Sequence, residues 1–127
     1  MTITLGQRSL ARLEGVHPDL VRVVKRAALM SDIDFTVLEG LRTPARQKEL
    51  VAKGASKTLK SRHLTGHAVD LAVLIGGEIA WDWPLYHKLA PIVKAAAAAE
   101  NVPIEWGGDW RTFKDGPHWQ LPWKQYP

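Results

Sequence analysis

The sequence contains no cysteine among its 127 residues. This absence excludes disulfide bonds, zinc sites built from thiolates, and cysteine nucleophiles. It leaves the redox compartment open, because a cysteine-free chain can work in an oxidising or a reducing environment. Any metal site in this chain must therefore be built from histidine and carboxylate side chains.

Long apolar runs are also missing. The longest runs, such as residues 95–99, are far shorter than the roughly 20 residues that a membrane-spanning helix requires. The first residues, Met1 to Thr4, lack the basic segment followed by an apolar one that marks a secretory signal peptide. We therefore expect neither stable membrane insertion nor a signal peptide.

The length and composition are those of one globular domain. At 127 residues the chain has room for a single domain of ordinary size, which we expect to span residues 1–127. Hydrophobic residues make up 46% and charged residues 24%, close to the globular average, so intrinsic disorder and a fibrous repeat are both poor fits.

The charge balance is mildly basic. There are 17 Lys and Arg residues against 13 Asp and Glu, giving a net charge of +4 and a pI near 9.6. Such a balance favours polyanionic surroundings, either nucleic acid or an acidic cell envelope. The basic residues are scattered along the chain, which favours a solvated surface over a dedicated nucleic-acid patch. They include Arg8, Arg12, Arg22, Lys25, Arg26, Lys53, Lys57 and Lys60.

Hydrophobic periodicity predicts three helices. Apolar residues recur at spacings of three and four over residues 16–30, which is typical of an amphipathic helix. A second helix begins at the capping pair Thr43 and Pro44 and ends at Gly54. A third begins at Pro84 and runs to about residue 100, with a kink or break expected at Pro91.

The segments between these helices indicate strands and loops. Residues 33–38 alternate apolar and polar side chains, and residues 68–75 form an apolar run that contains Asp70. Residues 55–65 show no periodicity and indicate a loop, and residues 104–106 and 118–121 can pair as short strands. Helices and strands out of strict alternation predict an α+β fold with a small, mainly antiparallel sheet and flanking helices.

Asp70 suggests a metal site because it lies inside an apolar strand. Burying a carboxylate without a partner is costly, so Asp70 needs either an Arg or Lys in an ion pair or a divalent cation. His63, seven residues earlier, and the distant His118 would complete a set of two imidazoles and one carboxylate. Three such ligands leave one position of Zn²⁺ open for a water molecule, whose pKa falls towards neutrality.

Two further residues could complete hydrolytic chemistry at such a centre. Asp115 lies three residues before His118, and the turn made by Gly116 and Pro117 is needed to bring its carboxylate to the same side as a general base. Arg42, at a junction between strand and helix, could stabilise the oxyanion that develops on an attacked carbonyl. Alternatively, Asp115 could cap a turn and Arg42 could pair with Glu39.

Substrate contacts are suggested at Ser61 and Trp106. Ser61 could bind substrate or shape the loop that carries His63. Trp106 precedes Gly107 and Gly108, which would let a substrate backbone approach closely, so we assign it to a cleft wall.

The remaining histidines are expected to have other roles. Alternation along a strand places His67 on the face opposite Asp70, so it is not expected to be a ligand. His17 and His87 are expected to be solvated residues on helices.

Four segments, taken in order, resemble the zinc-dependent M15 peptidases. They are EGLRT at 39–43, SRHLTGHAVD at 61–70, EWGGDW at 105–110 and DGPH at 115–118. The similarity covers residues 35–121 and is strongest to the small L-alanyl-D-glutamate peptidases that phages use as endolysins. Many M15 peptidases carry Glu at the position of Asp115. With the shorter Asp at this position, the sequence resembles the endolysin branch of the family more than the dipeptidase branch.

This resemblance implies a fold, a site and a reaction. The fold is that of hedgehog and DD-peptidase domains. The ligands of Zn²⁺ are His63, Asp70 and His118, the catalytic base is Asp115, and Arg42 stabilises the substrate carbonyl or oxyanion. The substrate is the peptide stem of bacterial peptidoglycan, which enzymes of this kind cut either between L-Ala and D-Glu or at D-Ala-D-Ala.

The functional hypothesis is therefore a monomeric zinc peptidase that acts in phage lysis. It would remain in the host cytoplasm until a separate membrane pore releases it to the periplasm or cell wall. One alternative is a D-Ala-D-Ala carboxypeptidase or dipeptidase. Others are a cell-wall binding module that has lost turnover and a small basic nucleic-acid binder, the latter disfavoured by the scattered charge.

Overall fold

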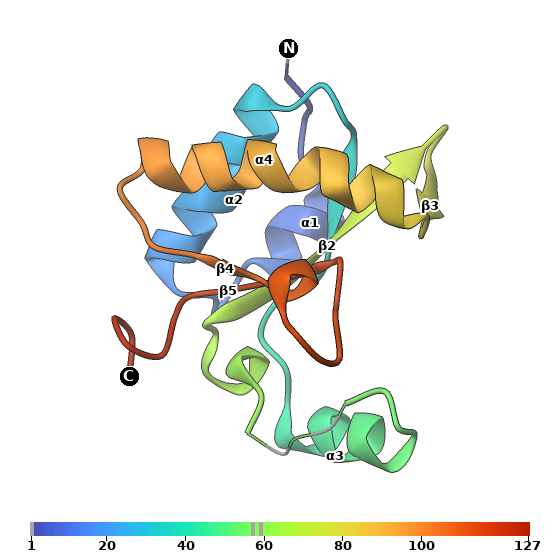
Figure 1. Ribbon diagram of the computed structural model, residues 1–127, viewed down its shortest axis with the longest axis vertical. Helices are drawn as coiled ribbons and strands as arrows, with labels where there is room; N and C mark the ends of the chain where they lie inside the picture. The colour runs from blue at the N-terminus through green and yellow to red at the C-terminus, as the bar shows by residue number, and fades with distance from the viewer. Residues whose placement is uncertain (1, 57, 59) are drawn as a thin grey trace.

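An antiparallel sheet lies at the centre of the computed structural model, which describes residues 2–56, 58 and 60–127 (Figure 1). Four strands follow the order β1, β2, β5, β4, and β3 pairs with the outer part of β2. Their bounds are β1 Phe35–Glu39, β2 Ala68–Ile75, β3 Glu78–Ala80, β4 Glu105–Trp106 and β5 His118–Gln120. Every pairing is antiparallel, which confirms the predicted α+β class.

Helices α2 and α4 pack against each other over one face of this sheet, and the shorter α1 lies beside β1 (Figure 1). The helices are α1 Gln7–Arg12, α2 Pro18–Met30, α3 Pro44–Ala52 and α4 Trp83–Ala99. Val69, Leu71 and Val73 alternate along β2 and contribute to the core with apolar residues of both long helices. Period-two alternation of β2 thus separates these core residues from Asp70.

The predicted helices form, with two differences. α2 begins at Pro18 rather than at residue 16, because His17 is the N-cap and its Nδ1 accepts a hydrogen bond from the Asp19 backbone N–H. α4 runs unbroken from Trp83 to Ala99, so the break allowed for at Pro91 does not occur. Buried residues on both sides of Pro91 hold the helix against the core.

Four short elements among the described residues were not predicted, one of them the 3₁₀ helix η2, Gly107–Asp109. α1 is one turn and a half long, too short to show periodicity, and Ser9 within it bonds the Thr36 hydroxyl at 2.8 Å and accepts from the Val37 N–H at 2.9 Å. β3 has only three residues and follows a tight turn in which Gly76 has a φ of +59°. The short 3₁₀ helix η1, Arg62–Thr65, lies in the predicted loop.

α3 lies apart from the other helices, below the sheet in Figure 1. It follows β1 closely, so its N-terminus starts near the end of the sheet where β1 and β2 pair at Glu39 and Asp70. Lys57 and Leu59 of the predicted loop are outside the described residues. In the part of the chain that is described, no helix combines the length and apolar character that crossing a bilayer requires.

Candidate metal centre and active site

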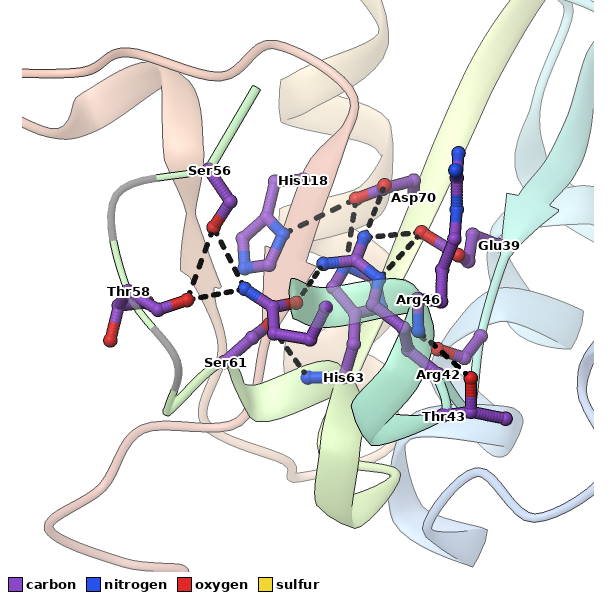
Figure 2. A network of polar contacts seen from close by, with 12 residues as sticks. Glu39, Arg42, Thr43, Arg46, Ser56, Thr58, Ser61, His63, Asp70 and His118 are labelled. Atoms are coloured by element: carbon purple, nitrogen blue, oxygen red, sulfur yellow. Dashed lines mark hydrogen bonds and ion pairs between the residues drawn. The ribbon is translucent and has the colours of Figure 1, made fainter. Parts of the chain in front are cut away.

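Three elements bring His63, Asp70 and the distant His118 together (Figure 2). His63 lies in η1, Asp70 in β2 and His118 at the start of β5, where it is the register partner of Asp70. Oδ1 of Asp70 lies 3.2 Å from Nε2 of His63 and 3.2 Å from Nδ1 of His118. One donor atom from each residue lies within 4.8 Å of the others, a spacing that could hold one metal ion.

The outer nitrogen of each imidazole has an acceptor of its own. Nδ1 of His63 lies 2.8 Å from the carbonyl oxygen of Gly40, and Nε2 of His118 lies 2.8 Å from Oε1 of Gln120. A carbonyl oxygen only accepts, so each outer nitrogen carries a proton. The inner nitrogens face Asp70, where each donates to the carboxylate when protonated and could offer its lone pair to a metal ion once that proton is lost, which is how metal-binding histidines are oriented. The donor set therefore fits a metal ion.

The electrostatics of the site centre on Asp70. Burial by itself would raise the pKa of Asp70, but hydrogen bonds from His118 and His63 outweigh it and leave that pKa far below its usual value. Burial likewise opposes protonation of His118, yet the hydrogen bond to Asp70 raises the pKa of His118 overall. The carboxylate thus stays ionised and available as a ligand.

Asp115 lines the same cavity as the three candidate ligands. Its backbone N–H donates to the carbonyl of Gly107 at 3.1 Å, and its own carbonyl accepts from the His118 N–H at 3.3 Å. The turn through Gly116 and Pro117 brings Asp115 to this side, as the sequence required. Burial, with the nearby charge of Asp70, raises the pKa of Asp115.

Arg42 lies beside the candidate ligands with its side chain only 8% exposed. Its guanidinium donates to Glu39, donates to Oε1 of Gln47 at 2.7 Å and lies 3.8 Å from Oδ2 of Asp70 (Figure 2). Its backbone N–H also donates to the carbonyl of His63 at 2.9 Å. The pairing with Glu39, weighed as an alternative, therefore coexists with a position in the cavity.

Ser61 lines the cavity and also caps η1. Its hydroxyl accepts a hydrogen bond from the backbone N–H of His63 at 3.2 Å. Ser61 thus shapes the segment that carries His63, which is one of the two roles considered for it; contact with substrate stays a prediction.

The placement of Trp106 differs from the expected cleft wall. Its side chain is 4% exposed, stacks on Trp119 with centroids 5.7 Å apart and lies outside the cavity that holds the candidate ligands. Its indole N–H donates to the carbonyl of Gly116 at 2.7 Å. A Cβ at Gly108 would lie 2.3 Å from the Trp106 ring, so the glycine accommodates the indole rather than a substrate.

The other histidines lie outside the donor set in the described residues. His67 faces away from Asp70, and its Nδ1 lies 2.7 Å from the hydroxyl of Thr65. His17 contacts the rings of His67 and Tyr126, so it is more enclosed than the solvated role expected for it. His87 is exposed on α4, as expected.

Sequence reasoning missed Gln47 and Gln120. Gln47 is buried and its amide nitrogen donates to Oγ of Ser56 at 2.9 Å and to the carbonyl of Thr58, while its oxygen accepts from Arg42. Gln120 follows His118 by two residues, and this same-face spacing in a strand was the available signal. Nothing local marks Gln47, whose partners come from other segments.

The cavity around these residues has a volume of about 680 Å³. Two imidazoles and a carboxylate that fit a metal ion, beside an acid and an arginine in one cavity, are the arrangement of a metal-dependent hydrolase.

The comparison with family models identifies the family. The model described as phage L-alanyl-D-glutamate peptidase matches residues 1–120, and the chain belongs to this family. The crystal structure of the L-Ala D-Glu endopeptidase ChiX from Serratia marcescens superposes with a TM-score of 0.90 and 51% sequence identity, covering 95% of this chain and 91% of that one.

Curated relatives agree with this assignment. The L-alanyl-D-glutamate peptidase of Escherichia phage T5 is 33% identical over 119 residues, which cover 91% of this chain and 87% of the phage protein. That of Listeria phage A118 is 33% identical over 129 residues, but this chain spans only 45% of its length. CwlK, a peptidoglycan L-alanyl-D-glutamate endopeptidase of Bacillus subtilis (strain 168), is 32% identical over 111 residues, 66% of its length.

Proposed function

We propose that this protein is a zinc-dependent peptidase that hydrolyses the bond between L-Ala and D-Glu in the peptide stem of bacterial peptidoglycan. The observation that carries the proposal is the convergence of donor atoms from His63, Asp70 and His118, all within 4.8 Å, in a cavity shared with Asp115. The names of the relatives supply the bond and the substrate.

The donor set suits zinc, with Nε2 of His63, Nδ1 of His118 and a carboxylate oxygen of Asp70 as ligands. Bound there, Zn²⁺ would supply a Lewis-acidic charge that polarises a peptide carbonyl and acidifies water. Three protein ligands are the number found in catalytic rather than structural zinc sites, where one position remains open to water or substrate.

Asp115 acts as the general base. Its carboxylate takes the proton from the attacking water and passes it to the leaving amide nitrogen of D-Glu. Burial raises its pKa, which makes the carboxylate a better proton acceptor than an exposed aspartate. The carbonyl and N–H of Asp115, bound to His118 and Gly107, fix the loop that carries this side chain.

Arg42 stabilises the negative charge that develops on the carbonyl oxygen of the substrate. Its hydrogen bonds to Glu39 and Gln47 hold the guanidinium in place before the substrate arrives. Ser61 lines the cavity, and its hydroxyl hydrogen-bonds the peptide backbone of the stem.

The test is digestion of purified peptidoglycan followed by mass analysis of the fragments. New fragments that begin with D-Glu are the expected result. Loss of terminal D-Ala alone would instead assign a carboxypeptidase, and binding without any cleavage would assign a wall-binding module. Strong, salt-dependent retardation of DNA would favour the nucleic-acid alternative.

The proposal extends to how the protein acts in the cell. As for an endolysin, we propose a monomer that stays in the host cytoplasm until a separate pore opens the membrane. The relatives from phages T5 and A118 support this setting. Gel filtration tests the monomer, and expression with and without a membrane-permeabilising partner tests the release: lysis is expected only with the partner.

A further inference from the structure

Basic and aromatic side chains line the cavity from different parts of the chain. The basic ones come from the region of α3 and the loop after it, and the aromatic ones include two tryptophans from the C-terminal segments. They are Arg42, Arg46 and Lys60 on one hand and Trp110 and Trp123 on the other. The cavity therefore offers both cationic and aromatic contacts.

Trp123 is exposed and yet held in place. The residue is 53% exposed, and the guanidinium carbon of Arg62 lies 4.0 Å from the centroid of its ring, as in a cation–π pair. An exposed tryptophan at the rim of a cavity presents a large apolar surface at a low entropic cost when its ring is already fixed.

Arg62 is the residue that holds it. Arg62 is 3% exposed, and within the described chain no carboxylate lies at ion-pair distance from it. Its guanidinium donates instead to the carbonyls of Leu121 at 3.0 Å and Tyr126 at 2.6 Å. A buried charge needs such hydrogen bonds. Through them Arg62, the residue next to His63, connects the C-terminal segment and Trp123 to η1.

The chemistry of the proposed substrate puts a sugar close to the scissile bond. In peptidoglycan, L-Ala is the only amino acid between the scissile bond and the lactyl group of the N-acetylmuramic acid sugar. One residue spans about 3.5 Å, so a stem bound with its scissile bond at the candidate metal site brings the sugar close to the side chains that line the same cavity, Trp123 among them. The apolar C–H face of a pyranose ring stacks on aromatic rings, whereas the anionic stem beyond D-Glu suits basic side chains.

We propose that Trp123, fixed by Arg62, is the platform that binds the N-acetylated sugar of the glycan strand next to the scissile bond. The inference rests on the proposed function, because that function sets the distance between bond and sugar. To the proposed function the inference adds a contact with the glycan. Because of this contact, the enzyme prefers peptide stems that are still attached to the glycan strand over free peptides.

The kinetic test compares a muramyl peptide with the same peptide lacking the sugar. Trp123→Leu is expected to lower kcat/KM about tenfold more on the sugar-bearing substrate than on the free peptide, the size of one lost stacking contact. Trp123→Phe should retain most of the preference. Trp81→Leu is the control, since Trp81 is 57% exposed and lies outside this cavity. Equal losses on both substrates, or no loss on either, would overturn the proposal.

A binding test separates this inference from the proposed function. The probe is the disaccharide of N-acetylglucosamine and N-acetylmuramic acid, added to the metal-free protein and followed by NMR of the indole N–H groups. The signal that is missing in Trp123→Leu should be the one that shifts. Shifts confined to other tryptophans would contradict the platform. Failure of the wild type to cut either peptide would contradict the proposed function alone.

Discussion

Replacing Asp115 with Ala tests the role of the base at the scale of one residue. We expect kcat to fall by about 10²- to 10⁴-fold, the usual contribution of a general base. Bound zinc, measured by elemental analysis, should stay at one ion per chain, because Asp115 is not in the donor set. Asp109→Ala is the matched control, an exposed acid paired with Lys94. An unchanged rate in Asp115→Ala would remove Asp115 from the mechanism.

The protonation of His118 predicts how zinc affinity depends on pH. In the metal-free protein the bond to Asp70 raises the pKa of His118 despite its burial, whereas a ligand imidazole must be neutral. Below the pKa of His118, zinc must therefore displace a proton in order to bind. In that range the affinity for zinc should rise by about tenfold per pH unit for each proton released, and above the pKa of His118 it should level off. Competition with a chelator between pH 5.5 and 8 measures this slope, and a flat profile would contradict the assignment of His118.

The position of some site residues could be predicted from the sequence, and that of others could not. His63, Asp70 and His118 were predictable because an acid in an apolar strand demands a partner, and the structure brings all three together. Trp106 was misplaced because neighbouring glycines suit two purposes, close approach of a substrate or room for a buried indole. The sequence alone does not distinguish these, since the ring's orientation depends on Trp119 and on the turn at residue 116.

At the scale of elements, Gln47 links α3 to the rest of the site. Gln47→Ala would leave the guanidinium of Arg42 and the carbonyl of Thr58 without this buried partner. We expect a loss of about 1–3 kcal/mol in the free energy of unfolding, as for other buried groups left unpaired. The midpoint of urea unfolding measures the loss, with the exposed Gln125→Ala as control. Equal midpoints would show that the network does not stabilise the fold.

Predictability of the elements followed their length and periodicity. α2 and α4 each show repeated apolar spacing over several turns, and β2 is a continuous apolar run, so these were expected from the sequence. α1 and β3 are too short to show a pattern and owe their structure to tertiary contacts, such as the bond between Ser9 and Thr36. Their absence from the prediction did not affect the site, which lies on the well-predicted strands and the motif around His63.

At the scale of the whole molecule, the metal centre should stabilise the fold. The donor set joins η1, β2 and β5, so zinc that binds only the folded chain shifts the unfolding equilibrium. A free zinc concentration 100 times Kd should add about 2.7 kcal/mol to the free energy of unfolding. Thermal unfolding with zinc and with a chelator tests this, and Asp70→Asn should show a much smaller shift. A melting temperature independent of zinc in the wild type would argue against a shared site.

The position of bound zinc decides whether His63, Asp70 and His118 share one metal ion. A crystal structure of the zinc-loaded protein, with the ion located by its anomalous scattering, gives that location. We expect one peak about 2.0–2.2 Å from Nε2 of His63, Nδ1 of His118 and a carboxylate oxygen of Asp70, with Asp115 facing the open side. A peak held elsewhere, or zinc bound by fewer than these three residues, would contradict it.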